Sequence, residues 1–397
     1  MRARYVVFAT RSGTLILWCA ALVSGMASEV RAQDADAWRA PFAAGEEARR
    51  SGDAAAYARE MATAAEAIPP GHLNRPFVQY HAARAAALDG READAVRWLR
   101  MAWDEGIESL MISFAAYDPA FETLTGRPAF RSVMDLAAQM ALSTRPLGRD
   151  VHLITGAGSN VVVKVTPETV LMVDTGYGSA LPALQRTIAE LGGGGVDAVI
   201  VTHPHEDHMG SAAQLGIDAQ LYAHSGTAAA MAEPYVFMEG VSIPPKPASA
   251  RPDTRVDAEM TIDFGGEQIR MLPTVAHTAG DISVYFTDAR VAHLGDAFLV
   301  SNPMMYPGTV DPDAFLDRLE GFVDAMHPET VVVGGHEEVT DLSAVRAQIG
   351  VTRDAMRFVR SSIGGGLTIE ETARAGQDRF PPQWTAFFYQ LFTQSGR

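Results

Sequence analysis

The chain has 397 residues, which is long enough for two ordinary domains or for one large one. Hydrophobic residues make up 47% of it and charged residues 20%, a globular composition that excludes wholesale disorder, collagen-like repeats and a coiled coil. It carries 32 basic and 48 acidic residues, a net charge of −16, so it is a poor binder of phosphate backbones and nucleic acid is not an expected partner. The single cysteine, Cys19, excludes a disulfide framework, a cysteine-based zinc site and a cysteine nucleophile.

Residues 1–32 are predicted to be a secretory signal peptide. Arginines precede an apolar run over residues 14–26, which is too short for a comfortable membrane span, and Ala32 ends a small-residue cleavage site before Gln33. An uncleaved N-terminal anchor is the alternative. Cleavage would remove four arginines and Glu29, which leaves 28 basic and 47 acidic residues, a net charge of −19 and no cysteine. We therefore expect a periplasmic or secreted protein with no membrane anchor after cleavage.

Residues 33–145 are predicted to form an all-α region of helical hairpins. Ala95, Leu99 and Ala102 recur at the spacing of one helix face, and Gly90 separates two helical runs. This pattern resembles a tetratricopeptide repeat, and the resemblance implies a groove that binds a protein partner. The alternative is a helical cap that packs on an enzyme.

Short β-rich runs separated by turn residues follow Leu147 and alternate irregularly with helices. The predicted strands are 151–154, 161–165, 170–173, 198–202, 268–272, 283–286, 291–294 and 330–333. A helix is predicted over 179–191, a long loop over 235–257, and two or three helices over 342–397. This pattern favours a layered arrangement of sheets and helices.

The motif from Thr202 to Gly210 is the strongest functional signal in the sequence. It places three histidines and an aspartate within six residues, directly after an apolar strand. In an extended loop His203 and His205 can converge on one ion, while Asp207 and His208 follow where the chain turns towards a helix and indicate a second position. Imidazole and carboxylate ligands suit zinc or iron, and zinc is the default metal for hydrolysis.

Three more candidate ligands lie downstream, each at the end of a predicted strand or in the turn after it: His277, Asp296 and His336. Together with the His-x-His-x-Asp-His motif they make residues 147–340 resemble the metallo-β-lactamase superfamily. The resemblance implies an α+β fold, an αββα sandwich over residues 146–397 that follows the all-α helical-hairpin region and holds two metals between its sheets. The implied ligands are His203, His205 and His277 for the first metal, Asp207, His208 and His336 for the second, and Asp296 as the bridge.

The resemblance also implies a chemistry. Two zinc ions, with iron or manganese as alternatives, would share a hydroxide that attacks a carbonyl, and Asp207 would be the catalytic residue that orients the nucleophile or passes a proton. Because Cys19 lies in the predicted signal peptide, the β-lactamases that use a cysteine ligand are excluded. His205 stands where the diiron flavoproteins have a glutamate, which argues against electron transfer to oxygen.

We therefore expect an exported dinuclear zinc hydrolase whose substrate is a small lactone, ester or β-lactam. Two alternatives stay open. One is an iron-dependent enzyme similar to the thiol dioxygenases, and the other is a periplasmic interaction protein that works through its helical region.

Some residues near the motif are expected to support the site or to have no part in it. Asp174 is expected to support the metal loop without binding metal. His224 and His293 are expected to be core or surface histidines, and Glu206, although it lies inside the motif, is assigned no role. Candidates for an apolar substrate wall, with ordinary packing as the alternative, are Tyr235, Phe237, Met238, Ile243, Met304, Met305 and Tyr306.

Overall fold

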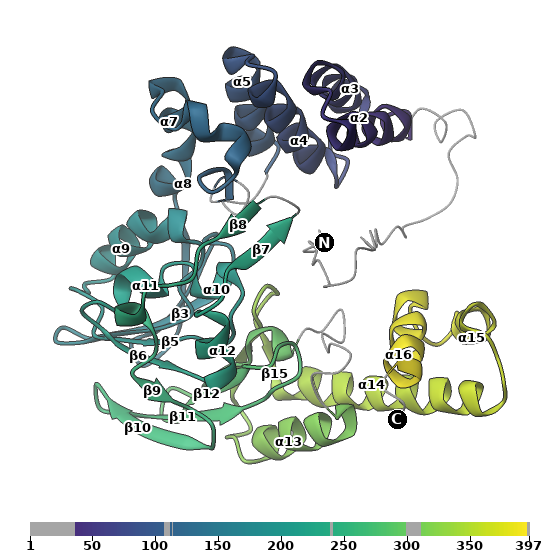
Figure 1. The fold of residues 1–397 in the computed structure, drawn as a ribbon. Helices are drawn as coiled ribbons and strands as arrows, with labels where there is room; N and C mark the ends of the chain where they lie inside the picture. Colours follow the sequence, from purple (N-terminus) through teal and green to yellow (C-terminus); the bar gives the residue numbers. More distant parts are fainter. Residues whose placement is uncertain (1–35, 107–111, 113, 239–240, 299–310, 395–397) are drawn as a thin grey trace. The chain divides into compact units, whose positions relative to one another are not determined.

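The computed structural model describes residues 36–106, 112, 114–238, 241–298 and 311–394 (Figure 1). The predicted signal peptide and the Met304–Tyr306 part of the predicted substrate wall lie outside the described residues. Among the helices that the structure describes, none is long and apolar enough to cross a membrane. The chain divides into two compact units, which we call the helical unit (up to Met140, together with 234–244) and the sheet unit (141–233, together with 245 onwards).

The helical unit consists of short helices joined by tight turns. Its helices are α2 (Arg39–Ser51), α3 (Ala54–Ala67), α4 (Arg75–Leu88), α5 (Glu92–Asp104), η1 (Pro119–Leu124), α7 (Pro128–Met134) and α8 (Leu136–Gln139). Gly52 and Gly90 follow α2 and α4 with φ angles of 77° and 75°, a left-handed conformation that lets the chain reverse into the next helix. The predicted all-α hairpins are therefore confirmed, with the break at Gly90, whereas the tetratricopeptide resemblance stays a prediction.

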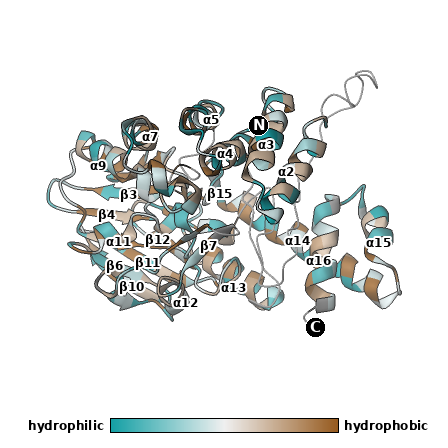
Figure 2. Cartoon of the chain, turned by 45° about the horizontal axis from the view of Figure 1, so that its top comes forward, coloured by the Kyte–Doolittle hydropathy of each residue, from teal (hydrophilic) through white to brown (hydrophobic). Residues whose placement is uncertain are grey.

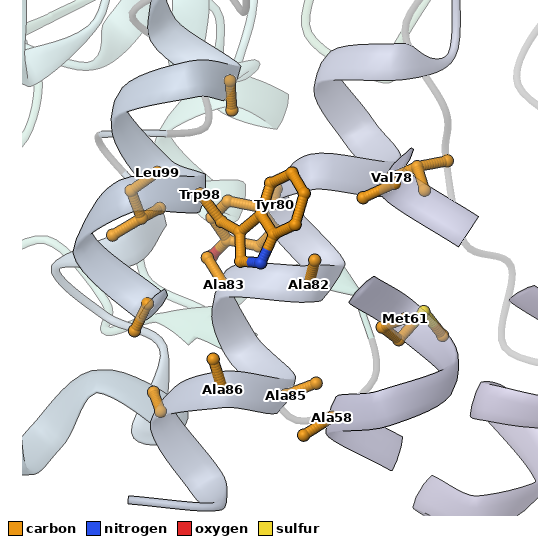
Figure 3. Packing of buried hydrophobic residues seen from close by; sticks show 14 of the residues in the cluster. Ala58, Met61, Val78, Tyr80, Ala82, Ala83, Ala85, Ala86, Trp98 and Leu99 are labelled. Atoms are coloured by element: carbon orange, nitrogen blue, oxygen red, sulfur yellow. The ribbon is translucent and has the colours of Figure 1, made fainter. Parts of the chain in front are cut away.

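Small side chains let α4 pack closely on both of its neighbours. Its residues from Val78 to Ala87 are all buried, and half of them are alanines. Figure 3 shows Trp98 and Leu99 of α5 on one side of α4, and Ala58 and Met61 of α3 on the other. Burial of a side chain the size of Leu99 or Met61 contributes about 1.5–3 kcal/mol.

A β-hairpin belongs to the helical unit although it lies far from the helices in sequence. Its strands, β7 (Tyr235–Met238) and β8 (Val241–Ile243), pair in antiparallel fashion. Val241 and Ile243 pack with the buried Phe114, and the Tyr235 ring stacks on the Phe114 ring with 6.1 Å between centroids and 6° between planes. Tyr235 and Ile243 therefore have the packing role that was the alternative to a substrate wall.

The prediction of a long loop over 235–257 is wrong in part, because this segment contains the hairpin, the short helix η3 (Ala248–Ala250) and the strand β9 (Thr254–Arg255). The prolines at 244, 245 and 247 lie just after β8, so they end its pairing without preventing it. The side chains of Phe237 and Met238 lie outside the described part of the structure.

Two sheets form the centre of the sheet unit. The first has the strand order β1-β2-β3-β4-β5-β6-β9 and the second β10-β11-β12-β13-β14-β15. The strands of the first sheet are β1 (Ser143–Gly148), β2 (Val151–Thr155), β3 (Val161–Val165), β4 (Val170–Val173), β5 (Ala198–Ile200), β6 (Gln220–Ala223) and β9. Those of the second are β10 (Met260–Phe264), β11 (Glu267–Pro273), β12 (Ile282–Phe286), β13 (Val291–His293), β14 (Val331–Val333) and β15 (Thr340–Asp341).

Helices lie in the connections of both sheets. The first sheet has η2 (Gly178–Ala180), α9 (Leu181–Glu190), α10 (Glu206–Met209), α11 (Ala212–Leu215) and α12 (Ser225–Ala230). The second has η4 (Gly295–Ala297), α13 (Pro312–Asp324), α14 (Leu342–Gly364), α15 (Ile369–Gly376) and α16 (Pro382–Gln394). Figure 1 shows α9 and α11 on one side of the strands and α13 and α14 on the other. The last three helices confirm the prediction for the C-terminal segment.

Apolar residues fill the space between the two sheets. Val173 and Ile200 of the first sheet belong to the same buried cluster as Met271 and Val284 of the second. A separate cluster covers the other face of the second sheet, where Leu294 packs with residues of α13, α14 and α16. In Figure 2 the helices carry hydrophilic and hydrophobic colours on different faces, as expected for outer layers. The predicted αββα layering is therefore confirmed.

Candidate metal centre

The seven predicted ligands all lie in segments that follow the carboxyl ends of strands, and three of them, Asp207, His208 and Asp296, lie in the short helices α10 and η4. The β4–β5 and β13–β14 pairs are parallel, so the loops after the two strands of each pair leave from one edge. The residues 203–208 follow β5, His277 follows β11, Asp296 follows β13 and His336 follows β14. The structure gathers all seven in two groups, His203, His205, His277 and Asp296 in the first and Asp207, His208 and His336 in the second.

Three imidazoles and one carboxylate make up the first group. Nε2 of His203 lies 2.8 Å from Nδ1 of His205, and Nε2 of His277 lies 2.9 Å from that same atom. Oδ2 of Asp296 lies 3.9 Å from His203 Nε2 and 3.6 Å from His277 Nε2. Imidazole nitrogens and a carboxylate oxygen are the ligand types that zinc takes in proteins.

The second group adjoins the first through Asp296. Nε2 of His336 lies 3.3 Å from Nε2 of His208 and 3.1 Å from Oδ2 of Asp207. The Asp296 carboxylate lies 3.4 Å from both rings, with Oδ1 towards His208 and Oδ2 towards His336. Asp296 thus lies beside histidines of both groups, which is the place that the sequence predicts for it.

Asp174 supports the segment that carries His203 and His208. Its Oδ1 accepts a hydrogen bond from Thr202 N at 2.8 Å, and its Oδ2 accepts one from Thr202 Oγ1 at 2.9 Å. The same Oδ2 lies 2.7 Å from Nδ1 of His208, so that ring turns Nε2 towards the cluster. The Thr202 hydroxyl lies 3.0 Å from Nδ1 of His203 and orients the second ring. A carboxylate that is hydrogen-bonded to one ring nitrogen of a histidine fixes the orientation and the tautomer of that ring. This is the supporting role predicted for Asp174.

Gly335 leaves room for the Asp296 carboxylate. A Cβ at this position would lie 1.8 Å from Asp296 Oδ1, so no larger residue fits. The backbone here is fixed, because Gly335 N donates to Gly295 O at 3.0 Å and Gly335 O accepts from Asn160 N at 2.7 Å. The Asn160 side chain also donates to Gly334 O at 2.8 Å. These hydrogen bonds join the turn before His336 to the loop after β2.

A buried carboxylate shapes the turn that carries His277. Oδ2 of Asp281 accepts hydrogen bonds from the backbone N–H groups of Ala276 and Thr278, each at 2.7 Å, and Oδ1 accepts one from Thr278 Oγ1 at 2.6 Å. Thr227 Oγ1 donates to Gly280 O at 2.8 Å and fixes the other side of the turn. Asp281 was not predicted from the sequence, although an aspartate four residues after His277 is a signal for a turn.

Burial keeps the imidazoles of the first group neutral. It lowers the pKa of His205 to about 3 and that of His277 to about 4, and it lowers the pKa of His203 well below its usual range. A neutral imidazole has a free lone pair, which a metal ligand needs.

The carboxylates of the cluster are ionised. Burial by itself raises the pKa of Asp207, but His208 and His336 beside it bring the value down to about 2. The same two histidines hold the pKa of Asp296 well below its usual range against the effect of burial. In turn, Asp174, Asp207 and Asp296 overcome the burial of His208 and raise its pKa to about 10.

Two other histidines near the motif have structural roles. His293 is buried, lies 3.0 Å from Asn160 O through Nε2 and accepts a hydrogen bond from Gly295 N through Nδ1 at 3.1 Å. His224 accepts from Gly226 N at 3.0 Å and so caps α12. Neither belongs to the two groups, as predicted.

One residue of the motif has a partner that the sequence did not reveal. Glu206 is buried, and its carboxylate is ion-paired with Lys246, with 2.9 Å from Nζ to Oε1 and 3.2 Å from Nζ to Oε2. No role for Glu206 follows from the sequence, because its partner lies 40 residues away and no local pattern indicates the pair.

The metallo-β-lactamase superfamily model matches residues 154–346, a range that contains all seven clustered residues. This part of the chain is a domain of the metallo-β-lactamase superfamily. A hydroxyacylglutathione hydrolase from Acidiphilium cryptum is 31% identical to this chain over 150 residues, which are 37% of this chain and 53% of the relative. The match therefore spans about half of that relative's length.

The solved structures similar to this chain include metallo-β-lactamases. DIM-1 metallo-β-lactamase has a TM-score of 0.44 and 18% identity, and covers 53% of this chain and 96% of its own. A metallo-β-lactamase from Pontibacter korlensis has a TM-score of 0.41 and 21% identity, and covers 53% of this chain and 99% of its own.

The donor set of the metallo-β-lactamase domain fits a metal site. Oδ1 of Asp296 is buried and has no hydrogen-bond partner among the described residues, as expected for an oxygen that faces a cation. Ionised carboxylates lie beside the neutral imidazoles of the first group, and Gly335 leaves room for the Asp296 carboxylate that both groups share. The cluster therefore has the charge and the lone pairs that a divalent metal needs.

Proposed function

We propose that the chain is a metal-dependent hydrolase that holds two zinc ions and cleaves a small carbonyl substrate. The observation that carries the proposal is the position of Asp296, whose carboxylate touches the histidines of both groups. A structural zinc site is usually single and closed by four ligands, whereas seven donors with one shared carboxylate suit a pair of ions. Iron or manganese in the same ligands is the alternative metal content.

In this proposal the seven clustered residues bind the metals, and one of them, Asp207, also acts on the attacking water. The first ion would be held by His203, His205 and His277, the second by Asp207, His208 and His336, with Asp296 shared. Two cations in these ligands would supply a water of lowered pKa and a Lewis acid for the carbonyl oxygen. Because Asp207 is ionised, its carboxylate would accept a hydrogen bond from the attacking water and orient it. Asp174 and Thr202 keep the rings of His208 and His203 turned towards the cluster.

The charge of the domain favours a neutral or amphiphilic substrate. Several basic side chains between positions 240 and 298 already have acidic partners: Lys246 is paired with Glu206 and Arg270 with Glu259. Arg290 is likewise paired with a glutamate. Because these cations are neutralised, they do not form a binding site for a polyanion, and we propose a lactone, an ester or a β-lactam.

The curated relative favours a second candidate. It is a hydroxyacylglutathione hydrolase, so a hydroxyacylglutathione thioester is the alternative substrate for this chain. The zinc-loaded protein should be assayed against lactones, β-lactams, aryl esters and acyl-glutathione thioesters side by side. Faster turnover of a ring substrate or ester supports the first candidate, and a thioester turned over far faster than all others decides for the second.

The Asp296→Asn variant tests the proposed mechanism. It keeps the size of the side chain but removes the negative charge that both groups share, so we expect turnover to fall by about a hundredfold or more while the fold is kept. Metal analysis and circular dichroism on the same preparation separate metal loss from unfolding. Near-normal turnover would show that Asp296 does not bind the metals.

A further inference from the structure

Lys246 and Lys164 are the two lysines of the chain, and both form ion pairs with buried glutamates of the sheet unit. Lys164 Nζ lies 3.9 Å from Glu267 Oε2 and donates to Arg149 O at 3.3 Å. Lys246 Nζ lies 2.9 Å from Glu206 Oε1, with the two side chains only 11% and 7% exposed. A buried pair is expensive to desolvate and gives weak evidence of a gain in stability, so its position needs another explanation.

The position of Glu206 in the motif supplies that explanation. It lies between His205, a member of the first group, and Asp207, a member of the second. It also begins α10, whose four residues Glu206–Met209 are all buried. Any rotation of the Glu206 backbone would therefore move one candidate ligand of each group.

The Lys246 backbone is itself held in place. Its N–H donates to Met231 O at 2.8 Å, just after α12. Its carbonyl oxygen accepts from the Arg251 guanidinium at 3.4 Å. Because the backbone N–H and carbonyl groups of Lys246 are both hydrogen-bonded, its ammonium group reaches Glu206 from a fixed backbone position.

We infer that Lys246 is a positioning residue of the metal centre, which holds the Glu206 carboxylate away from the cations and so fixes the spacing of His205 and Asp207. This inference rests on the proposed function, because it assigns the two groups to metal ions. Without the lysine, Glu206 would be a buried carboxylate with no counter-charge, one residue from ligands of both metals. It would turn towards the cations as an extra ligand or distort the turn that carries both neighbours.

The experiment compares Lys246→Met with Lys164→Met. Both remove a lysine from a buried ion pair, but the Lys164–Glu267 pair includes no residue of the metal motif. Zinc per chain and zinc affinity are measured by competition with a chromophoric chelator, and the melting temperature of each metal-free protein is recorded. We expect Lys246→Met to weaken zinc binding by about tenfold or more, and Lys164→Met to lower the melting temperature with zinc affinity within about twofold of wild type.

Two further variants keep the test decisive if Lys246→Met folds poorly. Lys246→Arg retains the charge and is expected to restore zinc affinity to within about threefold of wild type. The double variant Glu206→Gln with Lys246→Met removes both charges and is expected to recover most of the lost affinity. Equal zinc affinity in Lys246→Met and Lys164→Met would overturn the inference. A wild-type protein that binds no zinc, iron or manganese would instead overturn the proposed function on which the inference rests.

Discussion

Gly335 gives the most direct test of the site at the scale of one residue. An alanine there would place its Cβ 1.8 Å from Asp296 Oδ1 and 3.0 Å from His208 Cε1, so both side chains must move. We expect Gly335→Ala to weaken zinc binding by about tenfold or more, as metal analysis and chelator competition would show. Gly321→Ala is the control, because a Cβ on this α13 residue meets nothing within 4 Å, and it should leave zinc binding unchanged. Wild-type zinc affinity in Gly335→Ala would contradict the placement of Asp296.

Asp174 tests the support behind the ligands. Asp174→Asn would set an amide NH₂ group either against Thr202 N or against the Thr202 hydroxyl and the His208 ring, so at least one of these donors loses its acceptor in either orientation of the amide. We expect zinc affinity to fall by about 10–100-fold with a smaller change in melting temperature. Thr202→Ser keeps a hydroxyl group and should bind zinc nearly as wild type does. If Asp174→Asn retained wild-type affinity, Asp174 would not orient His208.

The ligand candidates could be predicted from the sequence, whereas most of their supports could not. His203 to His208 lie within six residues, and the other three each follow a strand, so short patterns identified them. The partner of Glu206 lies 40 residues away, and the hydrogen bond from Asn160 to Gly334 joins residues 174 positions apart. Contacts of this length depend on how the two sheets pack, and no local pattern encodes them.

At the scale of elements, the β7–β8 hairpin tests the division of the chain into units. Phe114 is fully buried with Val241 and Ile243, so Phe114→Ala should destabilise this cluster by about 3–5 kcal/mol. Hydrogen exchange should then accelerate at the Val241 and Ile243 amides. Because none of the seven clustered residues belongs to the helical unit, zinc content should stay at the wild-type level. Unchanged exchange at β8 would show that Phe114 does not hold the hairpin.

The pH dependence of the helical unit follows from His81 in α4. Burial is the main cause that lowers its pKa to about 3, aided by Arg84 and Arg49, while Glu46 Oε1 at 3.7 Å is the acidic group beside the ring. In the unfolded chain the pKa of His81 is near 6.5. Below that pH the unfolded chain therefore binds a proton at His81 that the folded unit does not bind. The contribution of the buried, neutral His81 to the stability of the helical unit is therefore complete above about pH 6.5. It is lost progressively as the pH falls towards 3.

Hydrogen exchange at the α4 amides measures this effect. Between pH 7.5 and 5.5, protection in the wild type should fall by about tenfold beyond the intrinsic pH effect on exchange. His81→Phe removes the titrating group and should lose much less protection over the same range. The same loss in both proteins would mean that another group causes the pH dependence.

Elements with a strong local pattern were predicted well, and the segment after α12 was not. Gly90 and the alanine spacing encode the turn and the contact face of α4 and α5, which are local features. The hairpin strands are short and rich in apolar residues, but the nearby prolines favoured a loop. Their partner, Phe114, lies more than a hundred residues earlier, so the tertiary contact decided against the local signal.

For the whole molecule, export is a separate prediction. The arginines, the apolar run and the small-residue site before Gln33 predict cleavage there, so mature protein should begin at Gln33 and be found in the periplasm or outside the cell. N-terminal sequencing of protein from fractionated cells of the native host measures this. Intact Met1 in the cytosolic fraction would contradict it.

The layered fold and the helical region could both be predicted from the whole sequence, because strand runs and helical spacing change near residue 147. The strand order could not be predicted, since parallel neighbours such as β4 and β5 are separated by a helix and pair through contacts distant in sequence. The assignment of 234–244 to the helical unit also required the structure, because the chain leaves the sheet unit and returns to it within eleven residues.

The central claim is that one cluster of seven residues holds two metals for hydrolysis, and metal stoichiometry tests it most directly. Residues 33–397 should be stripped of metal, reconstituted with zinc, dialysed and analysed for zinc per chain, with hydrolysis measured on the same sample. The account predicts about two zinc ions per chain and active protein, and about one ion and no turnover when His203→Ala and His205→Ala are combined. Wild-type protein that retains one zinc ion or none, or a double variant that keeps both ions, would contradict the account.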